Sequence, residues 1–429
     1  MHGLEWLMVA VFVAGYLAIA LEHFIKLNKA ASAILTGVIC WIIYSVASAD
    51  RVAMEGHLLE HLGDIASILF FLLGAMTIVT IVDMHDGFTV ITNRVRTTSK
   101  SKLLWILTIL AFFLSSLLDN LTTTIVMISL INRILTEKKD KWFFSGFMVI
   151  AANAGGAFSP IGDVTTTMLW IGGQITAWSI IEKTFLASLA VVLVPLVIAG
   201  LQFRGQHFAP VAPREENEMV VSYKNARIVL IAGVLSLVAV PFFKQATHLP
   251  PLMGMLFSLG FMWVLTTYMH RNQAQDFQKR FSITRALEIV DTPTILFFLG
   301  ILLAISALQS HGLLNELATW VNTVIPDIKV IAFAMGILSA VIDNVPLVAA
   351  LQGMYSLETF PQGHEFWEAI ALTCGTGGSI IIIGSAAGVA AMGIQSIDFF
   401  WYLMKIGWLA LVGFVAGNLV FWLQHAITG

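Results

Sequence analysis

Charged residues are scarce in this chain. Asp, Glu, Lys and Arg make up 11% of its 429 residues, whereas 58% are hydrophobic and the mean hydropathy is +0.86. Soluble domains contain roughly 25% charged residues, so the composition excludes an ordinary soluble protein and predicts an all-α polytopic membrane protein. The formal net charge of −3 gives no reason to expect nucleic acid as a partner, and we expect the lipid bilayer instead.

Cysteine is also nearly absent. Cys40 and Cys374 both lie inside apolar segments, so the sequence indicates neither a disulfide framework nor a cysteine-based zinc cluster. The first apolar segment has Glu5 near its start, no basic stretch before it and no small-residue cleavage site after it. This pattern favours a retained first span over a cleaved signal peptide, and we expect no cofactor.

Long apolar segments are abundant. A helix needs about 20 apolar residues to cross the hydrocarbon core of a membrane, and segments of about this length recur along the chain. The predicted spanning helices are 4–24, 31–48, 65–83, 143–172, 182–203, 228–243, 251–269, 293–310, 366–392 and 399–424.

Two further segments, 103–135 and 330–357, carry an Asp-Asn pair at their centres. Their apolar arms have roughly 11–16 residues, which at about 1.5 Å per residue do not cross a core of about 30 Å. We therefore expect two re-entrant hairpins with polar tips in the middle of the membrane. A charged side chain at that depth costs at least roughly 2.5 kcal/mol, so these aspartates are functional candidates. The alternative is an aspartate that caps a helix at the membrane surface.

The distribution of positive charge supports a hairpin over 103–135. Both of its ends are basic, with Arg94, Arg96, Lys100 and Lys102 before it and Arg133, Lys138, Lys139 and Lys141 after it. Positive residues mark the cytoplasmic side. The resulting topology places all but four of the 23 Lys and Arg residues inside and both termini outside; the exceptions are Arg51, Lys183, Lys244 and Lys329.

The chain contains a duplicated unit. The sequence Ile68–Leu72 recurs at Ile295–Leu299 with an offset of 227, and Asp119-Asn120 recurs at Asp343-Asn344 with an offset of 224. The pair Gly155-Gly156 recurs at Gly377-Gly378 with an offset of 222. Because each unit has five full crossings and one hairpin, the two copies are inverted in the membrane, an arrangement typical of secondary transporters.

This duplication defines the predicted domains. The first inverted repeat is 1–203, with its hairpin at 103–135 and a broken helix at 143–172; a cytoplasmic linker covers 204–227; the second inverted repeat is 228–429, with its hairpin at 330–357 and a broken helix at 366–392. We also expect interfacial amphipathic helices over 49–64 and 272–291. Asp64 and Asp291 would then mark helix boundaries.

Each repeat has a second polar interruption, in the predicted broken helix. Glycines let a helix unwind, which frees backbone groups for a ligand. We expect the hairpin tip and the broken helix of each repeat to form one polar pocket. The first pocket would gather Asp119, Asn120, Thr122, Thr123, Asn153, Ser159, Asp163 and Thr166, and the second Asp343, Asn344, Thr376, Ser379 and Ser385.

The two predicted pockets are unequal, because Ser385 stands where the offset of 222 places Asp163. Their oxygen-rich side chains suit a small hard cation, and no Arg or Lys is predicted in either pocket to hold an anion. A buried carboxylate that binds a cation must take up a proton when the cation leaves, since a bare buried charge is costly. Competition for one site is therefore an exchange mechanism.

The motifs Leu118–Thr123, Asn153–Gly156, Pro160–Asp163 and Ile342–Pro346 make the chain resemble the NhaD-type Na⁺/H⁺ antiporters of the ion transporter superfamily over nearly its whole length. The resemblance implies a bacterial inner-membrane homodimer that exchanges Na⁺ or Li⁺ for H⁺ by an elevator movement. In such a membrane the topology above places both termini in the periplasm, and the predicted pockets place Na⁺ at Asp119, Asp163 and Asp343. Related dicarboxylate carriers have Ser-Asn-Thr at the hairpin tips, where this chain has aspartate.

Two alternatives remain open from the sequence. One is a carrier of arsenite or an organic anion within the same superfamily, which a basic residue in the pocket would favour. The other is an intramembrane aspartyl protease that uses Asp119 and Asp163 as an acid-base pair, although the duplicated unit has no role in such an enzyme.

Overall fold

The structure is a computed structural model that describes the chain except residues 1, 21, 49, 93–96, 209–220 and 429. Arg94 and Arg96 of the predicted basic flank lie outside the described residues. The middle of the predicted linker 204–227 does as well.

Within the described residues, the regular secondary structure consists of helices and one isolated β-bridge between Ser99 and His207. Turns and loops connect the helices. Among the described residues, seven helices are long and apolar enough to cross a membrane, or eight if a bent pair of helices counts as one span. The prediction of an all-α polytopic membrane protein is confirmed at this level.

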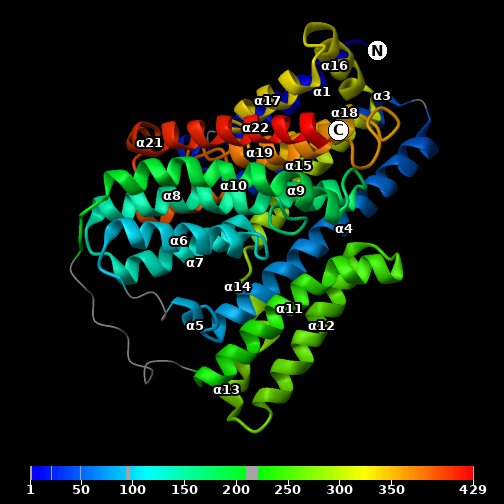
Figure 1. The fold of residues 1–429 in the computed structure, drawn as a ribbon. Helices are drawn as coiled ribbons and strands as arrows, with labels where there is room; N and C mark the ends of the chain where they lie inside the picture. Colours follow the sequence, from blue (N-terminus) through cyan, green and yellow to red (C-terminus); the bar gives the residue numbers. More distant parts are fainter. Residues whose placement is uncertain (1, 21, 49, 93–96, 209–220, 429) are drawn as a thin grey trace.

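One group of helices is built around α4 (Arg51–Met84), the long rod that runs diagonally in Figure 1. It packs against α12 (Pro251–His270), α15 (Thr292–Ser310) and α11 (Tyr223–Thr247). The rest of the group comprises α1 (His2–Ala20) and α3 (Lys29–Ala47), with the short helices α2 (Glu22–Ile25), α5 (Thr89–Thr92), α13 (Gln275–Arg280) and α14 (Ile283–Ile289).

The second group lies beside the first in Figure 1 and contains both predicted hairpins and both predicted broken helices. From the first half of the chain it takes α6 (Lys100–Ser115), α7 (Asn120–Ile134), α8 (Lys138–Ala157), α9 (Val164–Ile171) and α10 (Ala177–Gln202). From the second half it takes α17 (Ile328–Ser339), α18 (Asn344–Met354), α19 (Glu365–Gly377), α20 (Ala386–Gln395), α21 (Phe399–Tyr402), the π-helical turn Leu403–Gly407 and α22 (Trp408–Thr428).

The two halves make the same contacts at equivalent positions. Ser115 Oγ donates to the Ala152 carbonyl at 2.6 Å, and Ser339 Oγ donates to the Cys374 carbonyl at 2.7 Å. Each bond joins the end of one hairpin arm to the helix that precedes the break. Glycine permits this approach, because a Cβ at Gly155 or Gly377 would overlap the backbone of α6 or α17.

The structure differs from the sequence predictions in three elements. Helix α4 is continuous over 34 residues, so 49–64 is not a separate interfacial helix and Asp64 is not at a boundary. The expected helix over 272–291 is divided into α13 and α14, whereas Asp291 does cap α15. Helix α16 (Leu313–Val324) was not predicted, because its mixed polar and apolar sequence lacks a long apolar run.

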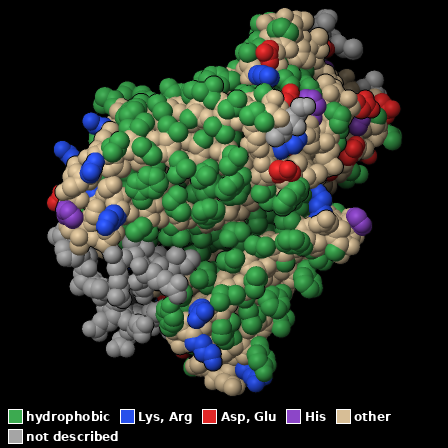
Figure 2. Space-filling model, viewed as in Figure 1, with side chains coloured by type: hydrophobic (Ala, Val, Ile, Leu, Met, Phe, Trp, Pro, Cys, Tyr) green, Lys and Arg blue, Asp and Glu red, His purple; other side chains and the backbone are tan. Residues whose placement is uncertain are grey.

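The surface has the charge distribution of a membrane protein. Figure 2 shows hydrophobic side chains over the middle of the visible face and most of the visible Lys and Arg at its left and lower ends. Most of the visible Asp and Glu lie at the upper right end, together with several Lys and Arg. Large apolar side chains such as Val264, Phe257 and Leu419 are more than half exposed. Exposure on this scale fits a lipid-facing surface.

Candidate functional site

Four helices begin at the centre of the second group, and each has a polar side chain as its N-cap. Asp119 caps α7 and Asp163 caps α9, while Asp343 caps α18 and Ser385 caps α20. A side-chain oxygen at this position satisfies backbone N–H groups that the helix leaves free. The aspartates are therefore held in place by the starts of the helices that the breaks and hairpin tips create.

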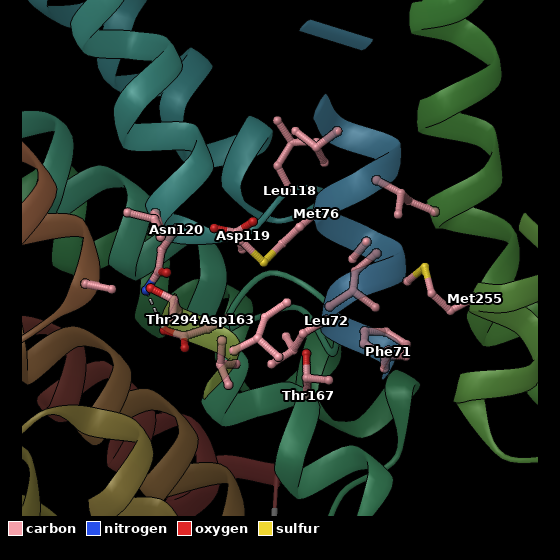
Figure 3. Close-up of a pocket in the computed structure, with 18 of the residues that line it drawn as sticks. Phe71, Leu72, Met76, Leu118, Asp119, Asn120, Asp163, Thr167, Met255 and Thr294 are labelled. Atoms are coloured by element: carbon pink, nitrogen blue, oxygen red, sulfur yellow. Dashed lines mark hydrogen bonds between the residues drawn. The ribbon is translucent and has the colours of Figure 1, made fainter. Parts of the chain in front are cut away.

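Asp163 lies at the centre of this arrangement and is 2% exposed. Its Oδ1 accepts from the Thr165 N–H at 3.0 Å, whereas its Oδ2 accepts from Asn120 Nδ2 at 3.0 Å and from Asn344 Nδ2 at 3.3 Å. Figure 3 shows Asn120 and Asp163 pointing toward each other. The two asparagines come from the tips of the two predicted hairpins, so Asp163 joins both halves of the chain.

Asn153 extends this network across the two broken helices. Its Oδ1 accepts from Asn120 Nδ2 at 3.0 Å, and its Nδ2 donates to Ser379 Oγ at 2.9 Å and Ser385 Oγ at 3.0 Å. The structure thus forms one connected polar centre where the sequence suggested two pockets. The offset of 222 places Gly375 opposite Asn153, so no pattern in the sequence pointed to this bridge.

A small cavity of about 40 Å³ lies where this centre faces α4 and α12. Its polar lining comes from Asp119, Asn120, Asp163, Thr167 and Thr294. Figure 3 shows the apolar side chains of Phe71, Leu72, Met76 and Met255 on the side of α4 and α12. By the usual measure of about 10–15 Å³ for one water molecule, the cavity has room for a few water-sized occupants.

One buried hydroxyl group near the centre, Thr123 Oγ1 in the first turn of α7, has no hydrogen-bond partner among the described residues. An unpartnered buried hydroxyl is costly, and this oxygen is suited to bind a hard cation. The Thr165 hydroxyl, in the first turn of α9, interacts with the Asp163 carboxylate. Thr165 was not among the predicted site residues.

Other predicted site residues are engaged locally. Thr122 Oγ1 donates to Asp119 Oδ2 at 2.6 Å, and Thr166 Oγ1 donates to the Asp163 carbonyl at 2.9 Å. Ser159 Oγ donates to the Ser116 carbonyl, which fastens the break to the hairpin tip, and Thr376 Oγ1 donates to a carbonyl of its own helix. These four side chains make local hydrogen bonds, and none of them is bonded to the Asp163 carboxylate or to the asparagines around it.

Asp343 has a different environment from the other two aspartates. It interacts electrostatically with Lys29 at the start of α3 and with Tyr16 of α1, both from the first group of helices. The Lys29 ammonium also lies 4.7 Å from the centre of the Phe297 ring. The expectation that no Lys or Arg comes near either pocket is therefore wrong for Asp343, and sequence offsets could not reveal it because Lys29 belongs to a distant segment.

The electrostatics of the centre favour a cation. Helix N-termini carry partial positive charge and commonly bind anions. Here the chain's own carboxylates already occupy the N-termini of α7, α9 and α18. An anionic ligand would meet like charge at these positions, whereas a cation would find carboxylate, amide and hydroxyl oxygens.

Comparison with known proteins gives a consistent picture. Residues 5–377 match the family model CitMHS, described as citrate transporter. The chain is 43% identical over 423 residues to sodium/proton antiporter 1 of Arabidopsis thaliana. The alignment covers 97% of this chain and 72% of the relative. It is 30% identical over 445 residues to the Na⁺/H⁺ antiporter NhaD of Vibrio cholerae, covering 94% of this chain and 88% of that protein.

A further relative is the Na⁺/H⁺ antiporter NhaD of Alkalimonas amylolytica, 28% identical over 457 residues, with 97% of this chain and 90% of the relative covered. These names describe transporters and not enzymes, which removes the aspartyl protease alternative. The chain therefore belongs to the CitMHS family, in which its relatives include the NhaD-type sodium/proton antiporters, and it is a multi-pass membrane transporter of that kind.

Proposed function

We propose that the protein exchanges Na⁺ or Li⁺ for H⁺ and that cation and proton compete for the buried carboxylates around Asp163. The observation that carries the proposal is the position of Asp163, which is 2% exposed and bonded to asparagines of both halves. A bare carboxylate at this depth needs either a cation or a proton. Loss of one ion therefore favours uptake of the other.

The asparagines around Asp163 suit such a competition. Asn120 and Asn344 donate N–H groups to Asp163 Oδ2, the arrangement that an ionised carboxylate favours. An asparagine amide that turns over offers its carbonyl oxygen at the same place. Each asparagine could then change from a partner of the carboxylate to a ligand of the cation, together with Asp119 at the cavity wall.

We further propose two inverted repeats and an elevator movement of the second group of helices against the first. The equivalent serine bonds at Ser115 and Ser339 support the duplication. The cavity beside Asp119 supports the movement, because it lies at the boundary between the groups and its far wall is made of apolar side chains of α4 and α12. An apolar wall makes few specific bonds that would resist sliding.

The orientation, the membrane and the oligomeric state are also proposals. The basic end seen in Figure 2 supports a cytoplasmic location for that end, and both chain ends lie on the opposite, right-hand side of Figure 1. We propose a bacterial inner membrane with both termini in the periplasm, although the relatives include plant proteins. We also propose a homodimer. It is supported by α12, which is less buried than the other candidate spans and therefore leaves a helix face that a second copy can cover.

The exchange proposal is tested in everted membrane vesicles with an acidified interior and a pH-sensitive dye. NaCl or LiCl should release protons from the interior with the wild-type protein, and Asp163→Asn should abolish this release. Asparagine is also a good N-cap, so the substitution removes the charge and keeps the start of α9. The matched control is Asp327→Asn, an exposed cap of α17. Full exchange by Asp163→Asn would refute the site.

The family description makes citrate transport a second candidate. The carboxylates at the helix starts argue against a tricarboxylate. Uptake of labelled citrate into proteoliposomes, with and without a Na⁺ gradient, separates the two functions. We expect no uptake above protein-free liposomes, and saturable Na⁺-dependent uptake would favour the citrate carrier.

A further inference from the structure

A buried charged cluster lies away from the Asp163 centre, near the start of α19. Glu368 of α19 is completely buried. Its Oε2 is 3.3 Å from Lys183 Nζ of α10 and 3.6 Å from His425 Nε2 of α22. Three helices of the second group therefore meet at one carboxylate. These two contacts are ion pairs, because neither Glu368 oxygen nor His425 Nε2 has a hydrogen-bond partner among the described residues.

The hydrogen bonds of His425 fix where its protons are. Its Nδ1 lies 3.0 Å from the Phe421 carbonyl oxygen. A carbonyl can only accept, so Nδ1 carries a hydrogen and donates it. In a neutral imidazole, Nε2 would then present a lone pair to the Glu368 carboxylate, and two acceptors would face each other in a buried space. A second proton, on Nε2, turns this repulsion into the attraction of an ion pair.

The charge of Lys183 determines whether the proton is on Glu368 or on His425. Its ammonium approaches the same Glu368 oxygen and also donates to the Gly363 carbonyl at 3.3 Å. A positive charge at this place favours the ionised carboxylate, so the proton resides on His425. The other charged groups near this end are Glu182 beside Lys183 on α10, Glu365 in the first turn of α19, and Lys329, whose ammonium lies over the Trp422 ring of α22.

We propose that Glu368 and His425 form a second proton-binding site, separate from the cation site, which holds one proton on His425 Nε2 facing Glu368 Oε2. Helix α19 connects the two sites. Gly375 lies seven residues after Glu368, roughly 10 Å along the helix, and a Cβ there would be 3.7 Å from Asp163 Oδ2. Loss of the proton pushes the start of α19 away from α22 and disturbs the wall of the cation site.

The site is open to the medium at one end, since the Lys183 side chain is 38% exposed and the His425 side chain 12% exposed. In the proposed topology this end faces outside. The proton therefore comes from the external solution, and external alkalinity empties the site and slows exchange. This role in exchange rests on the proposed function, whereas the bound proton does not depend on it.

The proton is detected directly by nitrogen-15 NMR of the full-length protein labelled at histidine and held in lipid nanodiscs. His425→Gln identifies the signal. At about pH 7.5, where an ordinary histidine is mostly neutral, we expect His425 to be an imidazolium. In Glu368→Gln it should become a neutral imidazole with hydrogen on Nδ1. A neutral His425 in the wild-type protein would overturn the proposal, whether or not the protein exchanges cations.

The role in exchange is tested in proteoliposomes by measuring the exchange rate as a function of the pH on the side that the Glu368–His425 site faces. Glutamine at position 425 offers Glu368 an N–H that does not titrate. We expect wild-type exchange to fall several-fold as the external pH rises to about 9, above the titration range of ordinary histidine, and His425→Gln to retain most of its activity there. His248→Asn, at the exposed C-cap of α11, is the control and should follow the wild type, since asparagine tolerates the left-handed backbone there. Identical profiles for wild type and His425→Gln would refute the role.

Discussion

At the residue scale, the side chains around Asp163 form a site that depends on both halves of the chain. Asn120 and Asn344 reach the same carboxylate oxygen, and Asn153 connects Asn120 to Ser379 and Ser385. The aspartates could be predicted because a charge inside an apolar segment is conspicuous. Asn120, Asn153 and Asn344 were also predicted as site residues. Their bonds across the two halves were not predicted, because side-chain hydrogen bonds between distant segments leave no periodic pattern in a sequence.

Lys29 offers a residue-scale prediction. Its positive charge acts on Asp343 and opposes a cation near that carboxylate. Lys29→Gln should therefore increase the apparent affinity for Na⁺, measured as a lower half-saturating Na⁺ concentration in proteoliposomes. Lys26→Gln, three residues earlier and exposed, should leave the affinity unchanged. An unchanged or weaker affinity in Lys29→Gln would show that Lys29 does not compete with the cation.

At the element scale, the breaks in the helices are the features that create the site. Both breaks were predicted from glycine-rich sequence, and the structure has them at 158–163 and 378–385, between α8 and α9 and between α19 and α20. The continuous α4 was not predicted, because charged residues in its first turns resemble a separate amphipathic segment. A helix of 34 residues is roughly 50 Å long, so its polar start extends beyond a membrane core.

The close contact of α8 with α6 gives an element-scale prediction. A Cβ at Gly155 would overlap the Phe112 carbonyl of α6, so Gly155→Ala should force the helices apart and lower the melting temperature in detergent. Gly260→Ala is the matched control, because nothing lies within 4 Å of its added Cβ, and alanine favours a helix more than glycine does. If both variants melt like the wild type, this packing is not needed for stability.

A second element-scale prediction concerns the contact between α4 and α12. His85, just after the end of α4, is completely buried, and its Nε2 lies 2.9 Å from His270 Nε2. Burial lowers the pKa of His85 from 6.5 to about 4. The unfolded chain therefore binds this proton at a higher pH than the folded protein does, and folding stability falls as the pH decreases from about 6.5 toward 4.

By pH 5 the loss from His85 should be about 2 kcal/mol. Thermal unfolding in detergent at neutral and acidic pH measures it. His85→Gln should lose less stability on acidification than the wild type, because glutamine takes up no proton. His207→Gln, which replaces an exposed histidine, should behave like the wild type. Equal acid sensitivity in all three proteins would mean that His85 is not kept neutral in the folded state.

At the scale of the whole molecule, the sequence was sufficient for the class of protein and the positions of the polar interruptions. It predicted ten spanning helices, whereas the described residues contain seven that are long and apolar enough, or eight with a bent pair. It was insufficient for the way the two halves meet, because Asp163, Asn153 and Lys29 find partners more than a hundred residues away. The arrangement into two groups of helices, with the cavity at their boundary, likewise follows from packing between distant segments. Inversion of the repeats and the elevator movement remain proposals.

The central claim is that one buried site binds either a cation or protons. The most direct measurement adds NaCl to the purified protein in weakly buffered detergent solution and records the protons released. We expect release that saturates with Na⁺, a Na⁺ affinity that weakens as the pH falls, and no release from Asp163→Asn, whereas Asp327→Asn behaves like the wild type. Saturable Na⁺ binding without proton release, or with an affinity independent of pH, would contradict the account.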